Sequence, residues 1–326
     1  MPIVNRVYPD ECDYDGIVQL PLSRRSALKS ACLGALGLMA QTASAETVEI
    51  GGSKIEVVFE TGGWQLSKAV ILDWVSQCAR AIAAYYGHIP VATAQLRLSC
   101  ADGRHGILRG RTFGHHGAMT TLTIGQQTTP AELNDDWMLV HEMVHWCFPS
   151  VEDEHHWIEE GSATYIEPIA RVMIHNLTAR RIWGDMARDM PKGVPNPDDQ
   201  GLDHTNTWAS TYWGGALFCL LADVQIRTQT HCAKGLQDAM RSVVQNGGVI
   251  TAEWPLSKAF EIGDRATGTT VLTDLHERMG HHHMDVDLAK LWAQLGVVKD
   301  SGGITLSDNA PLAAVRRAIV PESSAG

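Results

Sequence analysis

The chain has 326 residues, enough for one large domain or for two subdomains that share a cleft. Its hydrophobic content of 44% and charged content of 19% are typical of a soluble globular protein with a real core. The formal net charge of −11 argues against nucleic acid or an anionic membrane surface as the main partner, because both need basic patches. No segment is apolar for long enough to predict a membrane span.

The first 45 residues are predicted to form a targeting segment. A twin-arginine pair stands in residues 23–29, a modestly apolar stretch follows over 31–39, and Ala43-Ser44-Ala45 fits a small-residue cleavage site. This order predicts export to the periplasm or the medium; the alternative is an N-terminal tail with a chance arginine pair. The rest of the chain is expected to divide into an α/β subdomain over 46–180 and a helical subdomain over 181–326.

The elements of the first subdomain begin with a strand pair over 47–60 that turns at Gly51-Gly52. Apolar residues at helical spacing predict a helix within 64–86, and alternation predicts a strand over 95–100. A Gly- and His-rich segment, 102–118, leads into a short strand over 119–124. We therefore expect a mixed sheet with a covering helix.

The next helix has a clear start signal. Thr129, Pro130 and Glu132 combine an N-cap, a first-turn proline and a capping-box glutamate, and apolar residues then recur at 133, 137, 140 and 144. A second helix is predicted to start near Trp157, and a long Pro-, Asp- and Gly-rich loop follows over 187–207. Beyond it the pattern predicts helices over 212–228, 233–245, 255–262, 271–279 and 285–295.

The strongest chemical signal is a His-Glu-x-x-His motif at residues 141–145. On a helix, residues four apart lie one above the other, so His141 and His145 can bind one ion. Glu142 lies one residue round the helix, where its carboxylate can hold a water that the metal polarises. The motif predicts one Zn²⁺, and the alternative is a chance pentapeptide on a surface helix.

A catalytic zinc needs a third protein ligand and one open position. One known pattern places a glycine at position 148 and a third histidine at position 151. It fails here, because these positions hold Phe and Val. A glutamate from the following helix is the other solution, and Glu159 and Glu160 are both available there. Neighbours on a helix point about 100° apart, so the two cannot serve equally.

The segment from Trp157 to Tyr165, which reads Trp-x-x-Glu-Gly-x-Ala-x-Tyr, resembles the gluzincin aminopeptidases. The nearest are the glycyl-aminopeptidase family and, more distantly, the aminopeptidase N type. The resemblance implies Glu160 as the third zinc ligand and a thermolysin-like α/β catalytic subdomain followed by a mainly helical one. The Tyr-Trp-Gly-Gly-Ala-Leu segment at 212–217 is similar to a helix start of these families and implies Tyr212 as the hydrogen-bond donor to the oxyanion.

The resemblance covers about residues 120–320, and it implies a zinc metallopeptidase that acts on a peptide substrate. Two features depart from it. Only 14 residues separate His145 from Glu160, fewer than these families usually have. The acid that grips a free amine is also missing, because the comparable segment reads Gly-Ala-Met-Thr-Thr at 117–121. Glu167 is the alternative amine ligand, and the 119–124 strand is predicted to pair with an extended peptide as an edge strand.

Two other functions stay open from the sequence. One is a non-catalytic zinc protein that binds peptides or cell-envelope components, and the other is a zinc hydrolase of non-peptide amides or esters. The histidines at 115–116, 155–156 and 281–283 are interpreted as solvated loop residues. Five cysteines follow residue 45 without a Cys-x-x-Cys pair, so a cysteine zinc site is not expected.

Overall fold

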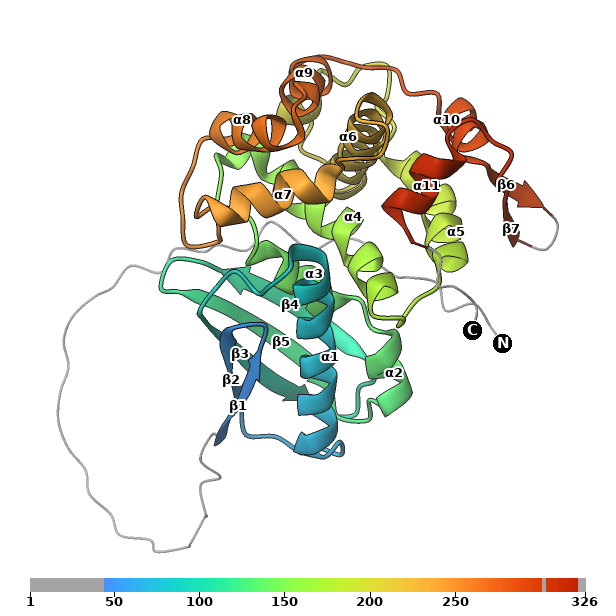
Figure 1. Cartoon of the computed structure of the whole chain (residues 1–326). Coiled ribbons are helices and arrows are strands. Elements are labelled where there is room, and N and C mark those ends of the chain that lie inside the picture. The colour runs from blue at the N-terminus through green and yellow to red at the C-terminus, as the bar shows by residue number, and fades with distance from the viewer. Residues whose placement is uncertain (1–43, 301–302, 322–326) are drawn as a thin grey trace, which may run out of the picture. The chain divides into compact units, whose positions relative to one another are not determined.

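The computed structural model describes residues 44–300 and 303–321. The described residues all belong to one compact unit. The predicted targeting segment lies outside the described residues except for Ser44 and Ala45, and both the segment and the subdomain boundary near residue 180 stay predictions. Within the compact unit, a sheet with its helices lies beside a mostly helical part (Figure 1), so the mixed α/β architecture followed by helices is confirmed.

The sheet has five strands in the order β1-β2-β3-β5-β4. They are β1 (Ser44–Ile50), β2 (Ser53–Phe59), β3 (Thr93–Ala101), β4 (Ile107–Phe113) and β5 (Ala118–Gly125). The predicted hairpin is confirmed: β1 and β2 pair antiparallel around Gly51 and Gly52, whose φ angles of 55° and 83° suit glycine. Strands β2, β3 and β5 are parallel, and β4 pairs antiparallel with β5.

One prediction about the sheet is wrong. The strand over 119–124 is β5, and it lies between β3 and β4 with both edges paired. The edge is β4, which lies inside the Gly- and His-rich segment. It was not predicted, because its sequence, Ile-Leu-Arg-Gly-Arg-Thr-Phe, has no clear apolar alternation. An extended peptide that adds a strand at this side of the sheet would therefore meet β4.

The first helix, α1 (Lys68–Tyr86), follows β2 and packs its predicted apolar face, including Trp74 and Ile82, into the core. The next helix was predicted as one element and is two: α2 (Pro130–Asp135) and α3 (Met138–His145). The capping box of Thr129 and Glu132 is confirmed. The break follows from the extended backbone of Asp136, whose Oδ2 accepts a hydrogen bond from the Leu139 amide and so starts α3.

The remaining elements are mainly helical, and the predicted tail helices are confirmed within a few residues. They are the short turns η1 (Asp153–His155), η2 (Met190–Gly193), η3 (Leu202–His204), η4 (Ala209–Gly214) and η5 (His276–Gly280), and the helices α4 (His156–Met173), α5 (Ala179–Asp189), α6 (Gly215–Gln229), α7 (Leu236–Gln245), α8 (Leu256–Thr267), α9 (Val271–Leu275) and α10 (Leu288–Leu295). Helix α5, the hairpin of β6 (Val297–Asp300) and β7 (Gly303–Leu306), and helix α11 (Ala313–Ile319) were not predicted, and the end of α5 and the turns η2 and η3 lie within the segment predicted as a loop over 187–207.

Helix α4 connects the two parts, since it contacts α1 and α3 on one side and α6 on the other (Figure 1).

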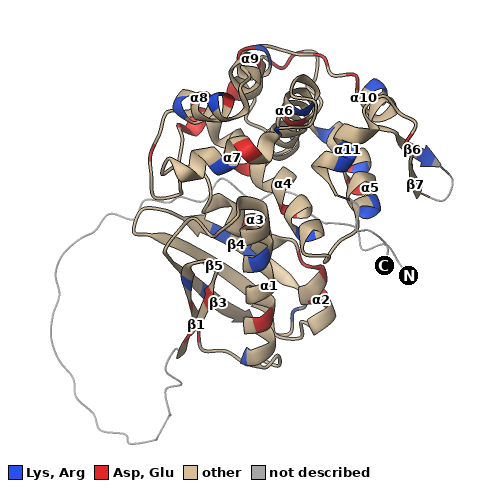
Figure 2. Ribbon diagram, viewed as in Figure 1, with Lys and Arg blue, Asp and Glu red and all other residues tan. Residues whose placement is uncertain are grey.

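Among the described helices, none is both long enough and apolar enough to cross a lipid bilayer. Acidic and basic positions are interspersed along α7 and α8 (Figure 2). The five cysteines of the described residues are all free thiols.

Candidate metal centre

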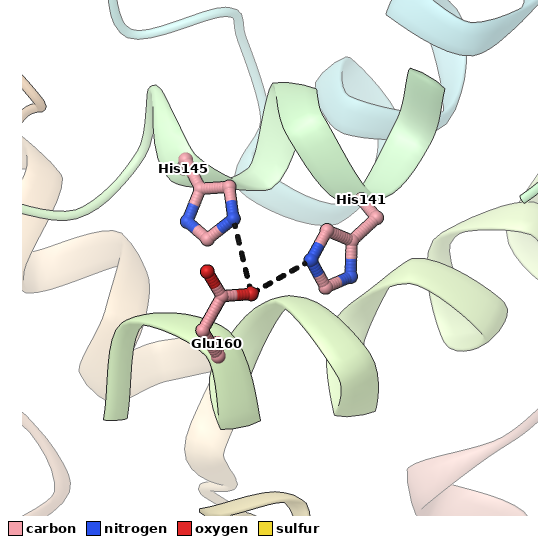
Figure 3. A group of neighbouring side chains, drawn as sticks. All are labelled: His141, His145 and Glu160. Carbon is pink, nitrogen blue, oxygen red and sulfur yellow. Dashed lines mark hydrogen bonds and ion pairs between the residues drawn. The ribbon is translucent and has the colours of Figure 1, made fainter. Parts of the chain in front are cut away.

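Two histidines from α3 and one glutamate from α4 converge on a single point (Figure 3). The four-residue spacing on α3 puts His141 and His145 on one side of the helix. Their Nε2 atoms lie 3.1 and 3.6 Å from Oε2 of Glu160. The structure therefore brings together the three side chains that the sequence suggested as metal ligands.

This donor set fits zinc. Two imidazole nitrogens and one carboxylate oxygen are the ligands of many catalytic zinc sites, which keep a fourth position open. Bonds of about 2.1 Å at tetrahedral angles put ligand atoms roughly 3.4 Å apart, and the separations of 3.1 and 3.6 Å to the Glu160 oxygen lie on either side of that value. The side chains of His141, His145 and Glu160 are only 4, 11 and 12% exposed, so an ion between them would be well shielded.

The charges of the cluster also favour a cation. Burial disfavours the charged forms of His145 and Glu160, but their mutual attraction is stronger. The Glu160 carboxylate raises the pKa of His145 to about 9. The two imidazoles in turn hold the pKa of Glu160 well below its usual range. The carboxylate is therefore ionised, and its charge is directed at the point where the histidines meet.

The ring of His141 is oriented by packing. Metal-binding histidines are usually held by a hydrogen bond from their second nitrogen, but the buried Nδ1 of His141 makes none within the described part of the chain. Instead the ring of Trp137 meets it edge-on, with the ring centroids 5.4 Å apart. The ring of Tyr212 stacks on it, with the centroids 6.1 Å apart and the planes at 19°. Two aromatic side chains thus fix the direction in which Nε2 points.

Glu142 is held by a chain of hydroxyl groups that reaches into the sheet. Its Oε2 accepts a hydrogen bond of 2.7 Å from the hydroxyl of Thr112 on β4. Because a hydroxyl has one proton, Thr112 must accept the bond of 2.8 Å that it shares with Thr120 on β5. Thr120 in turn accepts a bond of 3.0 Å from the indole nitrogen of Trp146. This relay gives Glu142, which is 8% exposed, a defined orientation as a carboxylate.

Sequence reasoning missed Thr112 and its neighbour Gly110. A Cβ atom at position 110 would lie 2.7 Å from Oε1 of Glu142, so only glycine lets the carboxylate lie against β4 at this point. The signal that could have revealed them was a strand within the Gly- and His-rich segment. That strand had no apolar alternation to mark it, and its partner on α3 is some thirty residues away.

The two glutamates of α4 have different roles, as expected from their directions on the helix. Glu159 points to the loop before α4, where Oε1 accepts the Val151 amide at 2.9 Å and Oε2 lies 3.0 Å from Nδ1 of His156. His156 then reaches Glu160, with its Nε2 3.4 Å from Oε1. The hydrogen bond to Glu159 raises the pKa of His156. The short connection between the two motif helices is thus closed by Glu159, and Glu160 alone faces the histidines.

Tyr212 reaches the centre from the π-helical turn η4, which runs into α6. Two motif glycines bring this segment close to α4. A Cβ atom on Gly161 would lie 2.3 Å from the backbone of Gly215, and one on Gly215 would lie 2.1 Å from the carbonyl oxygen of Trp157. The glycines of the two motifs therefore meet each other, and their lack of side chains sets how near Tyr212 comes to His141.

Two expectations about side chains near the centre are wrong. Glu167 is 1% exposed and pairs with the buried Arg171 at 2.9 Å, so it is not available to a substrate amine. The histidines at 155, 156 and 281 are not simply solvated: His156 contacts Glu159 and Glu160, and His155 and His281 both approach Asp203. Their partners are distant in sequence, so spacing alone gave no sign of them.

No family model matches this sequence, and no curated protein matches it. Among solved structures, an aminopeptidase N family protein from Idiomarina loihiensis aligns with a TM-score of 0.58 and 14% identity, over 82% of this chain and 53% of that one. A mutant M1 zinc metallopeptidase from Deinococcus radiodurans aligns with a TM-score of 0.48 and 14% identity, over 75% of this chain and 52% of that one. The second similarity is too weak to carry an argument. The chain shares the fold of part of the first protein and spans about half the length of these proteins.

Proposed function

We propose that this protein is a zinc-dependent hydrolase of peptide bonds, with one Zn²⁺ held by His141, His145 and Glu160. The observation that carries the proposal is the meeting of these three donors beside Glu142, a carboxylate that is not a ligand and is separately oriented. A purely structural site has no use for such a base. Zinc in such a site supplies Lewis acidity, which makes water a nucleophile near neutral pH and polarises a carbonyl group.

The chain's own residues supply the rest of the chemistry. Glu142 accepts the proton of the attacking water and later donates it to the leaving amine. Thr112 keeps the Glu142 carboxylate in one orientation, with Oε1 free of that hydrogen bond. Tyr212, stacked on His141, donates a hydrogen bond to the negative charge that develops on the carbonyl oxygen.

The edge strand β4 supports a peptide as the substrate. It lies at the end of the sheet, beside α3, and Glu142 touches it at Thr112 and Gly110. An extended peptide can pair with such an edge through main-chain hydrogen bonds. We propose that this subdomain is thermolysin-like because its edge strand runs beside the zinc-motif helix.

We propose that a free N-terminus is not required. The acidic side chains nearest the metal ligands are engaged: Glu142 by Thr112, Glu159 by Val151 and His156. Glu167 is buried with Arg171. An ammonium group would therefore meet no carboxylate of the kind that the glycyl-aminopeptidase family uses.

The decisive experiment is a cleavage profile on a peptide library, half of it N-acetylated, with zinc-loaded and chelated protein. We expect both halves to be cleaved, the activity to disappear with the chelator, and zinc to restore it. Cleavage of free peptides alone would show an aminopeptidase. Absence of cleavage by zinc-loaded protein would overturn the proposal of a peptidase. It would leave a non-catalytic binding protein or a hydrolase of non-peptide amides. Assays with amide and ester model substrates would distinguish these two, because only the hydrolase would cleave them.

We also propose that the protein is exported to the periplasm or medium through its twin-arginine segment. The supporting observation is the order of an arginine pair at 24–25, an apolar stretch and a small-residue cleavage site. Replacing both arginines with lysine should leave unprocessed chain in the cytoplasm. Normal appearance of the processed chain outside the cytoplasm would contradict this proposal.

A further inference from the structure

A second group of histidines surrounds one buried carboxylate in the helical part of the chain. Asp203, in η3, has a side chain that is 4% exposed. Its Oδ1 lies 2.9 Å from Nδ1 of His155, and its Oδ2 lies 2.9 Å from Nε2 of His276 and 3.4 Å from Nε2 of His281. We call these four residues the distal cluster. Potential ligand atoms of His155, Asp203 and His276 all lie within 4.8 Å of one another.

Two nitrogen-to-oxygen distances in the distal cluster resemble those at the metal centre. At the metal centre, two Nε2 atoms lie 3.1 and 3.6 Å from one oxygen of Glu160. In the distal cluster, two Nε2 atoms lie 2.9 and 3.4 Å from one oxygen of Asp203. The five-residue spacing of His276 and His281 suits the π-helical turn η5, where the amide of His281 bonds to the carbonyl of His276 at 3.3 Å. The wider turn puts both rings on one side.

Close contacts at two glycines bring η3 and η5 together. A Cβ atom on Gly280 would lie 2.2 Å from the His276 ring and 3.3 Å from Oδ2 of Asp203. Gly201, whose φ is 112°, would place a Cβ atom 2.2 Å from the carbonyl oxygen of Gly280. Two glycines without room for a side chain therefore hold η3 against η5. The cluster is a packed arrangement and not a chance meeting of surface loops.

The carboxylate of Asp203 is oriented and charged. Burial opposes its ionisation, but hydrogen bonds from His276, Trp157 and His155 keep the pKa of Asp203 below its usual range. The indole nitrogen of Trp157 donates to Oδ1 at 2.7 Å, so Oδ2 is directed at His276 and His281. Three imidazoles around one ionised oxygen pair are the donors that zinc and similar divalent transition metals prefer.

We propose that the distal cluster binds a second divalent transition-metal ion of the zinc class through the group His155, Asp203 and His276. His281, whose Nε2 lies 3.4 Å from Oδ2 of Asp203, is the proposed fourth ligand. Four protein ligands would close the site, so its role is structural. The ion would join the start of α4, the 187–207 segment and η5. Trp157 stands one turn before Glu160, and η3 contacts the η4 turn that carries Tyr212. The distal cluster therefore supports two elements of the metal centre, and its metal does not depend on the proposed peptidase activity.

Metal counting tests the proposal in the full chain. We expect about two zinc ions per native chain, falling to one in His281→Ala, and two in the matched control His282→Ala. His281 is 42% exposed and His282 is 70% exposed, so neither replacement opens the core. One ion in all three proteins, or two in all three, would overturn the proposal. The remaining ion of His281→Ala should disappear when His141 and His145 are also replaced by alanine.

A titration with Co²⁺ makes the test independent of copurified metal. In the chain with both His141 and His145 replaced by alanine, we expect one Co²⁺ to bind and to raise the unfolding temperature. The visible absorption should be that of a site with imidazole ligands. Adding His281→Ala should abolish both effects, and adding His282→Ala should preserve them. Absence of binding in a folded background chain, shown by its circular dichroism, would overturn the proposal, as would equal binding with His281→Ala.

Discussion

The metal centre and the distal cluster present almost the same donors in different surroundings. In each, two histidine Nε2 atoms face one oxygen of a buried carboxylate, at 3.1 and 3.6 Å in the first and 2.9 and 3.4 Å in the second. Around Glu160 stand an oriented glutamate and a tyrosine. Around Asp203 stand a third histidine, the indole of Trp157 and the ring of Phe260, which lies 5.5 Å from His276.

The difference lies in the neighbours and not in the ligands. A base and a hydrogen-bond donor beside an incomplete ligand set are what hydrolysis requires. A fourth protein donor and an apolar wall are what a structural site requires. The carboxylate of Glu142 is what most clearly separates the two, and the predictions below act on that difference, from the largest expected effect to the smallest.

Replacing Glu142 with glutamine should have the largest effect on catalysis. The amide keeps the shape and can still accept the Thr112 hydrogen bond, but it cannot take a proton. We expect peptide hydrolysis to fall by about 10²–10⁴-fold. Zinc content and unfolding temperature should stay close to those of the wild type, because Glu142 is not a ligand. Steady-state kinetics with metal analysis on the same samples measure both.

The matching change at the distal cluster is Asp203→Asn. It removes the negative charge of a proposed metal ligand and leaves the general base Glu142 unchanged. We expect it to lower the unfolding temperature and the metal content more than it lowers turnover per folded, zinc-loaded molecule. If Asp203→Asn abolished turnover and Glu142→Gln did not, the assignment of the two sites would have to be exchanged.

Tyr212→Phe should come next in size. Phenylalanine keeps the ring that stacks on His141, so the ligand geometry is preserved and only the hydroxyl is lost. Loss of one donor to a developing oxyanion costs about 10²–10³-fold in kcat. KM should change little, since the hydroxyl acts in the transition state. A rise in KM with unchanged kcat would assign Tyr212 to substrate binding instead.

Glu160→Gln and Glu159→Gln compare a ligand with its neighbour. Changes outside the ligand set typically cost ~10–100-fold in metal affinity. We expect Glu160→Gln to exceed that range, because it removes a charged donor. Glu159→Gln should stay within it, because Glu159 is not one of the proposed ligands and bonds to Val151 and His156 instead. A zinc competition titration with a coloured chelator gives both affinities, and equal losses would refute the assignment of Glu160.

The sequence was sufficient to name the three candidate metal ligands because they lie on two consecutive helices with local signals. The spacing of His141 and His145 is helical, and Glu160 follows within the next helix. The distal cluster was not predictable, because His155, Asp203 and His276 come from three turns whose meeting depends on Gly201 and Gly280. Each histidine alone looks like a loop residue, so only the tertiary structure shows what they share.

The same limit explains the two errors near Glu142 and Glu167. Strand β4 has no apolar alternation because the more sheltered positions next to the exposed Arg109 and Arg111 hold Gly110 and Thr112, which are not apolar side chains. Glu167 shares a helix face with Glu160, and sequence direction alone made it a candidate for binding a substrate amine. Its partner Arg171, one turn further on, occupies it. Periodicity gives the face of a helix, but not what the opposite element places against it.

Thr112→Val should have the smallest effect of the series, and it tests whether the orientation of Glu142 matters. Valine keeps the shape but removes the hydroxyl that donates to Oε2 of Glu142 at 2.7 Å and accepts from Thr120. A hydrogen bond to a charged group contributes about 1.5–3 kcal/mol. Part of this would appear as lost stability, since Thr120 also loses a partner. The rest would appear in catalysis as a fall in kcat of roughly 10-fold, which corresponds to about 1.4 kcal/mol.

Thr112→Ser is the matched control, because serine restores the hydroxyl and lacks only a methyl group. Its kcat should return to within a few-fold of the wild type, and zinc content should be unchanged in both variants. If serine and valine reduced kcat equally, the effect would come from packing of β4 against α3 and not from the hydrogen bond. Because the distal cluster shares no hydrogen bond with this relay, its metal should be retained in both variants, so any change in turnover belongs to the metal centre alone.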